Sequence, residues 1–281
     1  MSSPEHAPPP TAGREGQSGT TGKRVDRPLP KLSPPSLKLT LRSLLRADFV
    51  SQARNVRALL GTLVLPVVYV AVLSTGKRAV ALGGPKFGVA SSLVAGMGLI
   101  AVAGYSLTLA RHRELGVFQR LRVAPIPTWE IMISRLVVQV AAMLGMAVIV
   151  LAVAVIGFSL HLSAGAWLLT LAMVVVVGAE FLGIGQAIVG LIRSSETVRA
   201  VAPVVFIPLF VLSIFSHLNV LGSTFEIVSR WSPGGVVGTT LAAAMQAGTW
   251  TFGTWGALAA TIGYAVVFAG IGIRWFRWTA G

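Results

Sequence analysis

The chain has 281 residues, of which 54% are hydrophobic and 11% are charged. Soluble domains carry about 25% charged residues, so this composition excludes a soluble enzyme, a disordered chain and a fibrous protein, and it indicates a protein of the lipid bilayer. The net charge of +14 lies in the amino-terminal region and in short gaps between apolar runs, which favours anionic membrane lipids over nucleic acid as the partner.

The amino-terminal region divides into two segments. Residues 1–35 are rich in Pro, Ser, Gly and Thr and lack the pattern of a cleaved signal peptide, so they predict a disordered cytoplasmic tail. Residues 36–57 predict an amphipathic helix lying in the headgroup layer. Its apolar and basic residues fall on different faces: Leu37, Leu41, Leu44, Leu45 and Phe49 against Lys38, Arg42 and Arg46. The alternative is a surface helix packed on another domain.

Residues 58–281 predict a membrane domain of six transmembrane helices, because about 20 apolar residues cross the hydrocarbon core. The expected spans are 58–75, 87–110, 136–160, 164–192, 200–216 and 250–273. Of the 23 Lys and Arg residues, only Lys77, Arg78, Lys86 and Arg230 fall in the gaps after odd-numbered spans. The positive-inside rule therefore predicts a multi-pass protein of the cell membrane with both termini in the cytoplasm.

Small residues and polar residues stand out within the spans. Spans two and four contain several of the 31 glycines (Gly96, Gly98, Gly104, Gly178, Gly183 and Gly185), which predict close helix packing or, alternatively, hinges. The composition offers no metal site, because there is no cysteine and the four histidines lack ligand spacing.

The gap after the second span is the most informative loop. Leu115, Phe118, Leu121 and Arg122 follow helical spacing, and Ala124-Pro125 ends the pattern because a residue before proline disfavours the α region. The sequence thus predicts a short cytoplasmic helix that could receive force from a soluble partner and tilt the adjacent spans. The alternative is a loop that is merely basic and interfacial.

This loop resembles that of the membrane subunits of ABC type-2 exporters. The matching residues are Glu114-x-Gly116 and Arg120-Leu121-Arg122-x-Ala124-Pro125, followed by Arg135. The Arg-Leu-Arg variant is most similar to the drug-resistance exporters of actinobacteria. Looser likenesses are Arg54-Asn55 ahead of Leu59 and Pro66, and Trp231-Ser232-Pro233 before span six. The chain departs from the common pattern at Val117, where many members have Thr, and at Ser134, where Gly is common.

The resemblance implies a transport pore of two permease subunits, identical or related, each contacting one of two nucleotide-binding subunits through the loop as its coupling helix. The implied coupling residues are Glu114, Gly116, Phe118, Arg120, Leu121, Arg122 and Pro125. Our hypothesis is that Glu114 and Arg120 pair with partner charges while Phe118 and Leu121 enter a groove. The chain contains no GxxxxGK[ST] motif, so we expect it to bind no cofactor, with ATP and Mg on the partner.

Two regions leave alternatives open. Residues 217–248 form either short helices dipping into the outer leaflet or a plain outer loop. Glu180 is an acidic residue within a span, and Gln139 and Gln186 lie in spans three and four. Glu180 could line a substrate path or hold a proton, or it could make an interhelical hydrogen bond to Gln139 or to the opposite subunit.

Three functions compete. The sequence favours an ATP-driven exporter of hydrophobic drugs or lipids that is not itself an enzyme. The alternative is a stand-alone proton-coupled transporter using Glu180, although the halves show no repeat of the kind common in such transporters. An intramembrane enzyme would need paired carboxylates, a Ser/His couple or metal ligands, and the spans offer Glu180 alone.

Overall fold

The computed structural model describes residues 37–54, 56–74, 84–117, 128–158, 160–216, 222–246 and 250–275. In these ranges the regular elements are all helical, which confirms the all-α prediction. The first half comprises α1 (Leu37–Arg54), α2 (Val56–Ser74), α4 (Gly84–Gly98), the π-helical segment η1 (Leu99–Tyr105) and α5 (Ser106–Glu114). The second half comprises α7 (Thr128–Phe158), α8 (Ala164–Leu191), α9 (Ser195–Phe215), α10 (Ser223–Trp231), α11 (Pro233–Ala244) and α12 (Phe252–Trp275).

Among the described residues, five helices are long and apolar enough to cross a membrane. They are the continuous helix Gly84–Glu114 (α4, η1 and α5), Met132–Phe158 within α7, and α8, α9 and α12. They correspond to the second to sixth expected spans. The first expected span coincides with α2, in which Gly61–Val72 is an apolar helix within the residues whose side chains the structure describes. The six-span topology therefore stays a prediction, and the expected tail at 1–35 lies outside the described residues.

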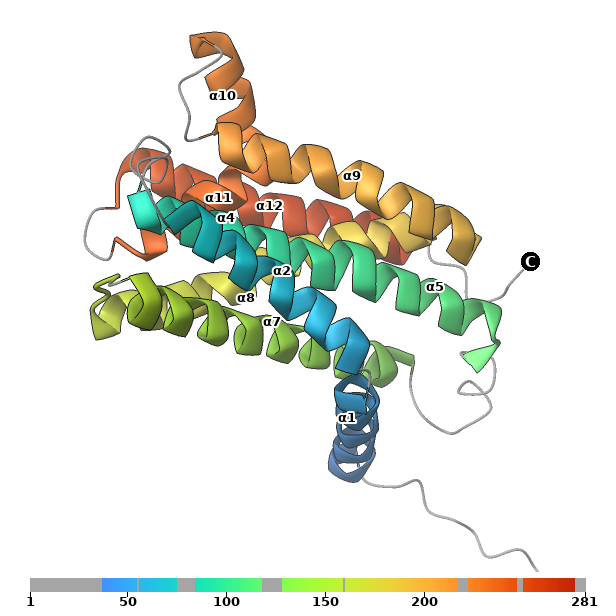
Figure 1. Cartoon of the computed structure of the whole chain (residues 1–281). Coiled ribbons are helices and arrows are strands. Elements are labelled where there is room, and N and C mark those ends of the chain that lie inside the picture. The colour runs from blue at the N-terminus through green and yellow to red at the C-terminus, as the bar shows by residue number, and fades with distance from the viewer. Residues whose placement is uncertain are drawn as a thin grey trace, which may run out of the picture. The chain divides into compact units, whose positions relative to one another are not determined.

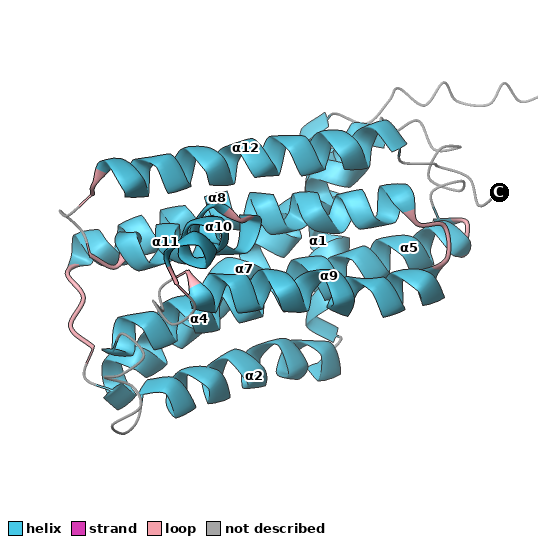
Figure 2. Ribbon diagram, turned by 90° about the horizontal axis from the view of Figure 1, so that it is seen from above, coloured by secondary structure: helices cyan, strands magenta, loops and turns pink. Residues whose placement is uncertain are grey.

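The arrangement of the long helices explains why α8 is so deeply buried. Figure 2 shows α12 and α2 at opposite edges, with α8 and α9 between them. α8 contacts α12, α7, η1 and α11, and one continuous apolar core joins it to α4, α7 and α9. α1 runs across the direction of α7 and packs on it (Figure 1). This orientation suits a helix lying in the membrane plane, although its interfacial position stays a prediction.

The glycines of spans two and four lie mostly at close contacts, as the packing interpretation expects. A Cβ on Gly185 would stand 2.7 Å from the carbonyl oxygen of Ala101, and one on Gly183 would stand 3.1 Å from that of Ala265. At Gly98 it would overlap the ring of Phe206. These residues let η1, α9 and α12 approach the neighbouring backbone at distances that any side chain would prevent.

The π-helical segment η1 is a feature that the sequence did not reveal. It interrupts the second span between α4 and α5, where the wider turn replaces i→i+4 hydrogen bonds by i→i+5 bonds. The hydroxyl of Ser106, the first residue after η1, donates a hydrogen bond to the carbonyl of Val102 within η1. Such segments often lie at functional sites, and η1 here separates the buried helix α4 from α5, whose last turn is basic.

The segment before the last span forms two short helices, so it is not a plain loop. Ser232 caps α11 by accepting a hydrogen bond from the amide of Gly235 over 3.1 Å, and Pro233 occupies the first turn, where its missing amide costs nothing. A Cβ on Gly234 would overlap the backbone of Leu209. The Trp-Ser-Pro-Gly-Gly sequence therefore turns the chain sharply and packs α11 against α9. Residues 217–221 and 247–249 lie outside the described residues.

We predict that Gly190→Val destabilises the bundle at the α8–α12 contact. A Cβ at position 190 would stand 2.9 Å from the carbonyl oxygen of Gly272, and overpacking of this kind costs about 1–3 kcal/mol. The measurement is the midpoint of thermal unfolding of the detergent-solubilised protein. Gly263→Val on α12 is the matched control, because its Cβ meets nothing within 4 Å. Equal midpoints for the two variants would contradict the close α8–α12 contact.

Candidate functional site

The predicted coupling residues fall into two groups. Glu114 is the last residue of α5, and Gly116 lies two residues after it, still within the described residues. The remaining ones lie outside the described residues: Phe118, Arg120, Leu121, Arg122 and Pro125. The structure therefore describes the first two of the predicted coupling residues, Glu114 and Gly116.

Gly116 ends α5 in a conformation that favours glycine. Its φ angle is +64°, in the left-handed region where a side chain is strained. The amide of Leu115 donates to the carbonyl of Arg111 over 2.9 Å, and that of Gly116 to the carbonyl of Arg113 over 3.1 Å. This is a glycine C-terminal cap, and it gives a physical reason for a glycine two residues after Glu114.

Arg113 anchors the end of α5 to the end of α8. Its side chain is 4% exposed, and its guanidinium donates to the carbonyls of Val189, Ile192 and Arg193 over 2.6–2.8 Å. The last carbonyls of a helix lack intrahelical partners, so a cation at that point both satisfies them and complements the helix dipole. Sequence reasoning did not single out Arg113. One signal in the sequence could have indicated this contact. Arg113 lies in the basic last turn of α5, whereas the last turn of α8 contains no basic residue of its own.

Glu114, the next residue, binds the beginning of α9. One carboxylate oxygen accepts from the backbone amide of Ser195 over 2.6 Å, and the other accepts from the Ser195 hydroxyl over 2.5 Å. Amides at a helix N-terminus lack intrahelical acceptors and attract a carboxylate. Both oxygens thus accept hydrogen bonds within the chain, and the hypothesis that Glu114 pairs with a charge on a partner stays a prediction. We call Arg113 and Glu114 together the α5 clamp.

The three polar residues expected within the spans do not meet. The hydroxyl of Tyr105 on η1 donates to Oε1 of Gln186 on α8 over 2.8 Å. The amide of Gln139 on α7 lies 3.5 Å from Oε1 of Gln52 on α1. Glu180 on α8 is fully buried, and its carboxyl oxygens have no hydrogen-bond partner among the described residues. The contact considered between Glu180 and Gln139 is therefore not present.

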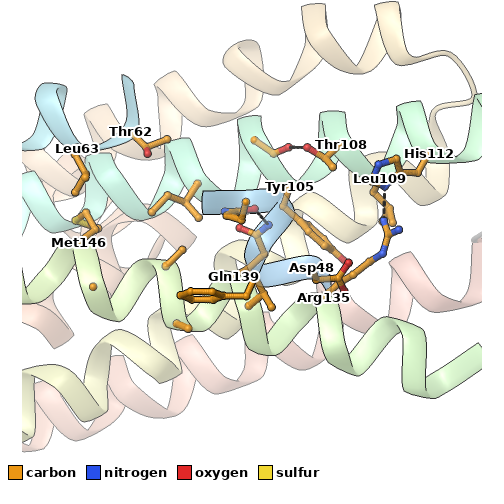
Figure 3. Close-up of a pocket in the computed structure, with 18 of the residues that line it drawn as sticks. Asp48, Thr62, Leu63, Tyr105, Thr108, Leu109, His112, Arg135, Gln139 and Met146 are labelled. Atoms are coloured by element: carbon orange, nitrogen blue, oxygen red, sulfur yellow. Dashed lines mark hydrogen bonds between the residues drawn. The ribbon is translucent and has the colours of Figure 1, made fainter. Parts of the chain in front are cut away.

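A pocket of about 580 Å³ lies between α1, α2, α7 and the second half of the second span, formed by η1 and α5. Figure 3 shows Asp48, Tyr105, His112 and Arg135 at one end and Leu63 and Met146 at the other. Nη1 of Arg135 lies 2.6 Å from Nδ1 of His112, and the hydroxyl of Ser134 donates to Asp48. Sequence reasoning missed this pocket, because it depends on α1 packing against α7.

The described residues contain no group of three or more His, Asp or Glu side chains able to hold a metal ion. The described residues form instead the hydrogen-bonded α5 clamp and a pocket of mixed polarity. Neither of them arranges a nucleophile, a base and an orienting group in the way that covalent or acid–base catalysis needs.

Comparison with known proteins identifies one family. The family model described as ABC-2 type transporter matches residues 40–245, which run from α1 to the end of α11. No curated protein matches the chain. The match includes the α5 clamp, the pocket and the short helices before the last span.

We predict that Arg113→Gln loosens the junction between α8 and α9. Hydrogen bonds from a charged group contribute about 1.5–3 kcal/mol each, so losing this anchor should lower the free energy of unfolding by about 3 kcal/mol. Hydrogen exchange of amides 188–193 should also accelerate, since the last turn of α8 loses its cap. Arg111→Gln on the same helix, where the arginine is exposed, serves as the control. Equal exchange in the two variants would contradict an anchoring role for Arg113.

Proposed function

The chain belongs to the ABC-2 type transporter family as a multi-pass membrane permease, and from this membership we propose that it is the permease subunit of an ATP-driven exporter. The cargo we propose is a hydrophobic drug or lipid moved out of the cell, as in the drug-resistance exporters that the Arg120-Leu121-Arg122 motif resembles. Both termini would lie in the cytoplasm, as the distribution of Lys and Arg predicts.

Permeases of this family typically work with an ATP-binding subunit, which supplies the catalytic activity. For this chain we propose two copies of such a subunit, holding ATP and Mg, and a second permease that is identical or related. The absence of a GxxxxGK[ST] motif from the sequence supports this division of roles.

The observation that best supports force transmission is the α5 clamp. The coupling segment begins directly after Glu114, and two consecutive side chains join that point to the end of α8 and the start of α9. A displacement of the segment would therefore reach three spans at once through charge-assisted hydrogen bonds. In this proposal Arg113 and Glu114 transmit motion, and the residues beyond Gly116 contact the ATPase subunit.

We predict that Glu114→Gln uncouples transport from ATP hydrolysis. The amide retains the shape but weakens the charge-assisted bonds to Ser195, so a moving coupling segment should no longer carry α9 with it. The permease–ATPase complex in proteoliposomes should keep most of its ATP hydrolysis while ATP-dependent efflux of a hydrophobic dye falls about tenfold, the effect of a coupling loss near 1.4 kcal/mol.

Glu196→Gln is the matched control for this experiment. Glu196 is an exposed acidic residue in the first turn of α9, next to Ser195, and does not take part in the clamp. We expect it to transport at the rate of the unaltered chain. Equal losses in both variants would refute a specific role of Glu114. Dye movement by the permease without any nucleotide-hydrolysing subunit would refute the exporter proposal and favour a proton-coupled transporter.

We further propose that Glu180 acts in the transport cycle and does not hold this conformation together. A buried carboxyl group without a hydrogen-bond partner is costly, and such groups call for an explanation outside the static fold. A conformation in which Glu180 finds a polar partner or cargo would offset that cost.

We predict that Glu180→Met leaves the thermal midpoint unchanged or raises it, because an apolar side chain of similar volume removes the uncompensated polar group. ATP-dependent dye efflux by the same variant should fall. A lowered midpoint with normal efflux per folded molecule would show that Glu180 is structural.

A further inference from the structure

The pocket between α1, α2, the second half of the second span and α7 changes in polarity along its length. Its lining on α7 runs from Arg135 to Ile149, a stretch of fifteen residues that rises about 21 Å along the helix. One leaflet of a bilayer with its headgroups is about 20–22 Å thick. The pocket therefore extends as far as a lipid-like molecule that stands upright in one leaflet.

The end of the pocket near the coupling segment is polar and positively charged. Arg111, His112 and Arg135 line it, together with the carboxylate of Asp48, which already accepts a hydrogen bond from Ser134. With His112 neutral, the lining residues at this end are two arginines and one carboxylate, which give a net charge of +1. This net positive charge favours a ligand headgroup with a negative charge, and two arginines suit a phosphate or carboxylate in particular.

The other end is lined by small and apolar side chains together with Thr62. Ala141, Ala142 and Gly145 on α7 leave room that Leu63 and Met146 border. A Cβ added to Gly145 would meet nothing within 4 Å, so this space is open in the folded chain. Two lining residues, Ile149 and Phe49, are 41% and 59% exposed. The described residues thus leave the pocket accessible from the side.

We propose that this pocket binds an anionic amphiphile, with its phosphate or carboxylate group at Arg111 and Arg135 and its alkyl chain along Ala142, Gly145 and Ile149. A volume of about 580 Å³ lies within the ordinary range of ligand pockets. The amphiphile is either a resident phospholipid of the cytoplasmic leaflet or the cargo itself, since both present the same chemistry. Binding there does not depend on ATP hydrolysis.

The test uses the full chain in nanodiscs that contain phosphatidylglycerol with a photoactivatable diazirine in its acyl chain. Mass spectrometry should locate the crosslink on α7 near Ala142–Ile149. The phosphatidylglycerol probe should label the chain about five times more than the zwitterionic phosphatidylcholine analogue does. This ratio corresponds to the binding free energy expected of one arginine near an anionic lipid. Arg111→Gln should abolish this preference, and Arg199→Gln, an exposed arginine on α9 outside the pocket, should retain it.

Gly145→Leu should reduce labelling about tenfold, because its side chain occupies the space of at least two methylene groups of the ligand. Gly157→Leu is the matched control on the same helix, since its Cβ also meets nothing within 4 Å and it lies outside the pocket. Ala142→Met fills the same space and replaces Gly145→Leu if that variant fails to fold. Equal labelling of the unaltered chain and the filled variants, or of the two lipids, would overturn the proposal.

Adding ATP to the complex with its ATPase subunit distinguishes the two sources of the amphiphile. Labelling that falls during turnover identifies cargo, and labelling that persists identifies a resident lipid; both results support the site. If ATP-driven export fails while labelling and its dependence on Gly145 remain, the exporter proposal is wrong and the binding site stands.

Discussion

The structure depends on how the chain satisfies the polar ends of its membrane helices. Within a span every amide bonds to its own helix, but the last carbonyls and first amides of each helix have no such partner. At the turn between α8 and α9 these groups are met from another span: Arg113 binds the carbonyls that end α8, and Glu114 binds the amide that begins α9. One requirement of helix chemistry thus joins three spans at the point where the predicted coupling segment starts.

The clamp and the pocket share a single helix. On α5, Arg111 and His112 line the pocket, whereas Arg113 and Glu114 turn to α8 and α9. Consecutive residues of a helix lie about 100° apart, so a short helix can present side chains to both sides. Any movement of α5 therefore changes the pocket and the clamp together. In the proposed exporter, this helix would link cargo binding to force from the ATPase without a long chain of intermediate contacts.

The membrane class and five long helices followed from composition and apolar run length, because lipid leaves the backbone few alternatives. The short helices before the last span were predicted only as one of two options, and Ser232 and Pro233 are the local signals that decide it. The sequence also suggested Glu114, but not its partner Ser195, which lies 81 positions away. Burial of Arg113 and packing of α1 on α7 are long-range features, and no periodicity within a segment encodes them.

The π-helical segment η1 determines the directions in which the side chains of α5, the next part of the second span, point around the helix axis. A wide turn accommodates one residue more than an α-helical turn, and one residue corresponds to about 100° of rotation and 1.5 Å of rise. Conversion of η1 to a regular helix would turn α5 by that angle while α4 kept its place in the core. Arg113 would then swing away from the α8 carbonyls. The winding of the apolar turns in η1 therefore determines which of the four polar side chains at 111–114 face the pocket and which face α8 and α9.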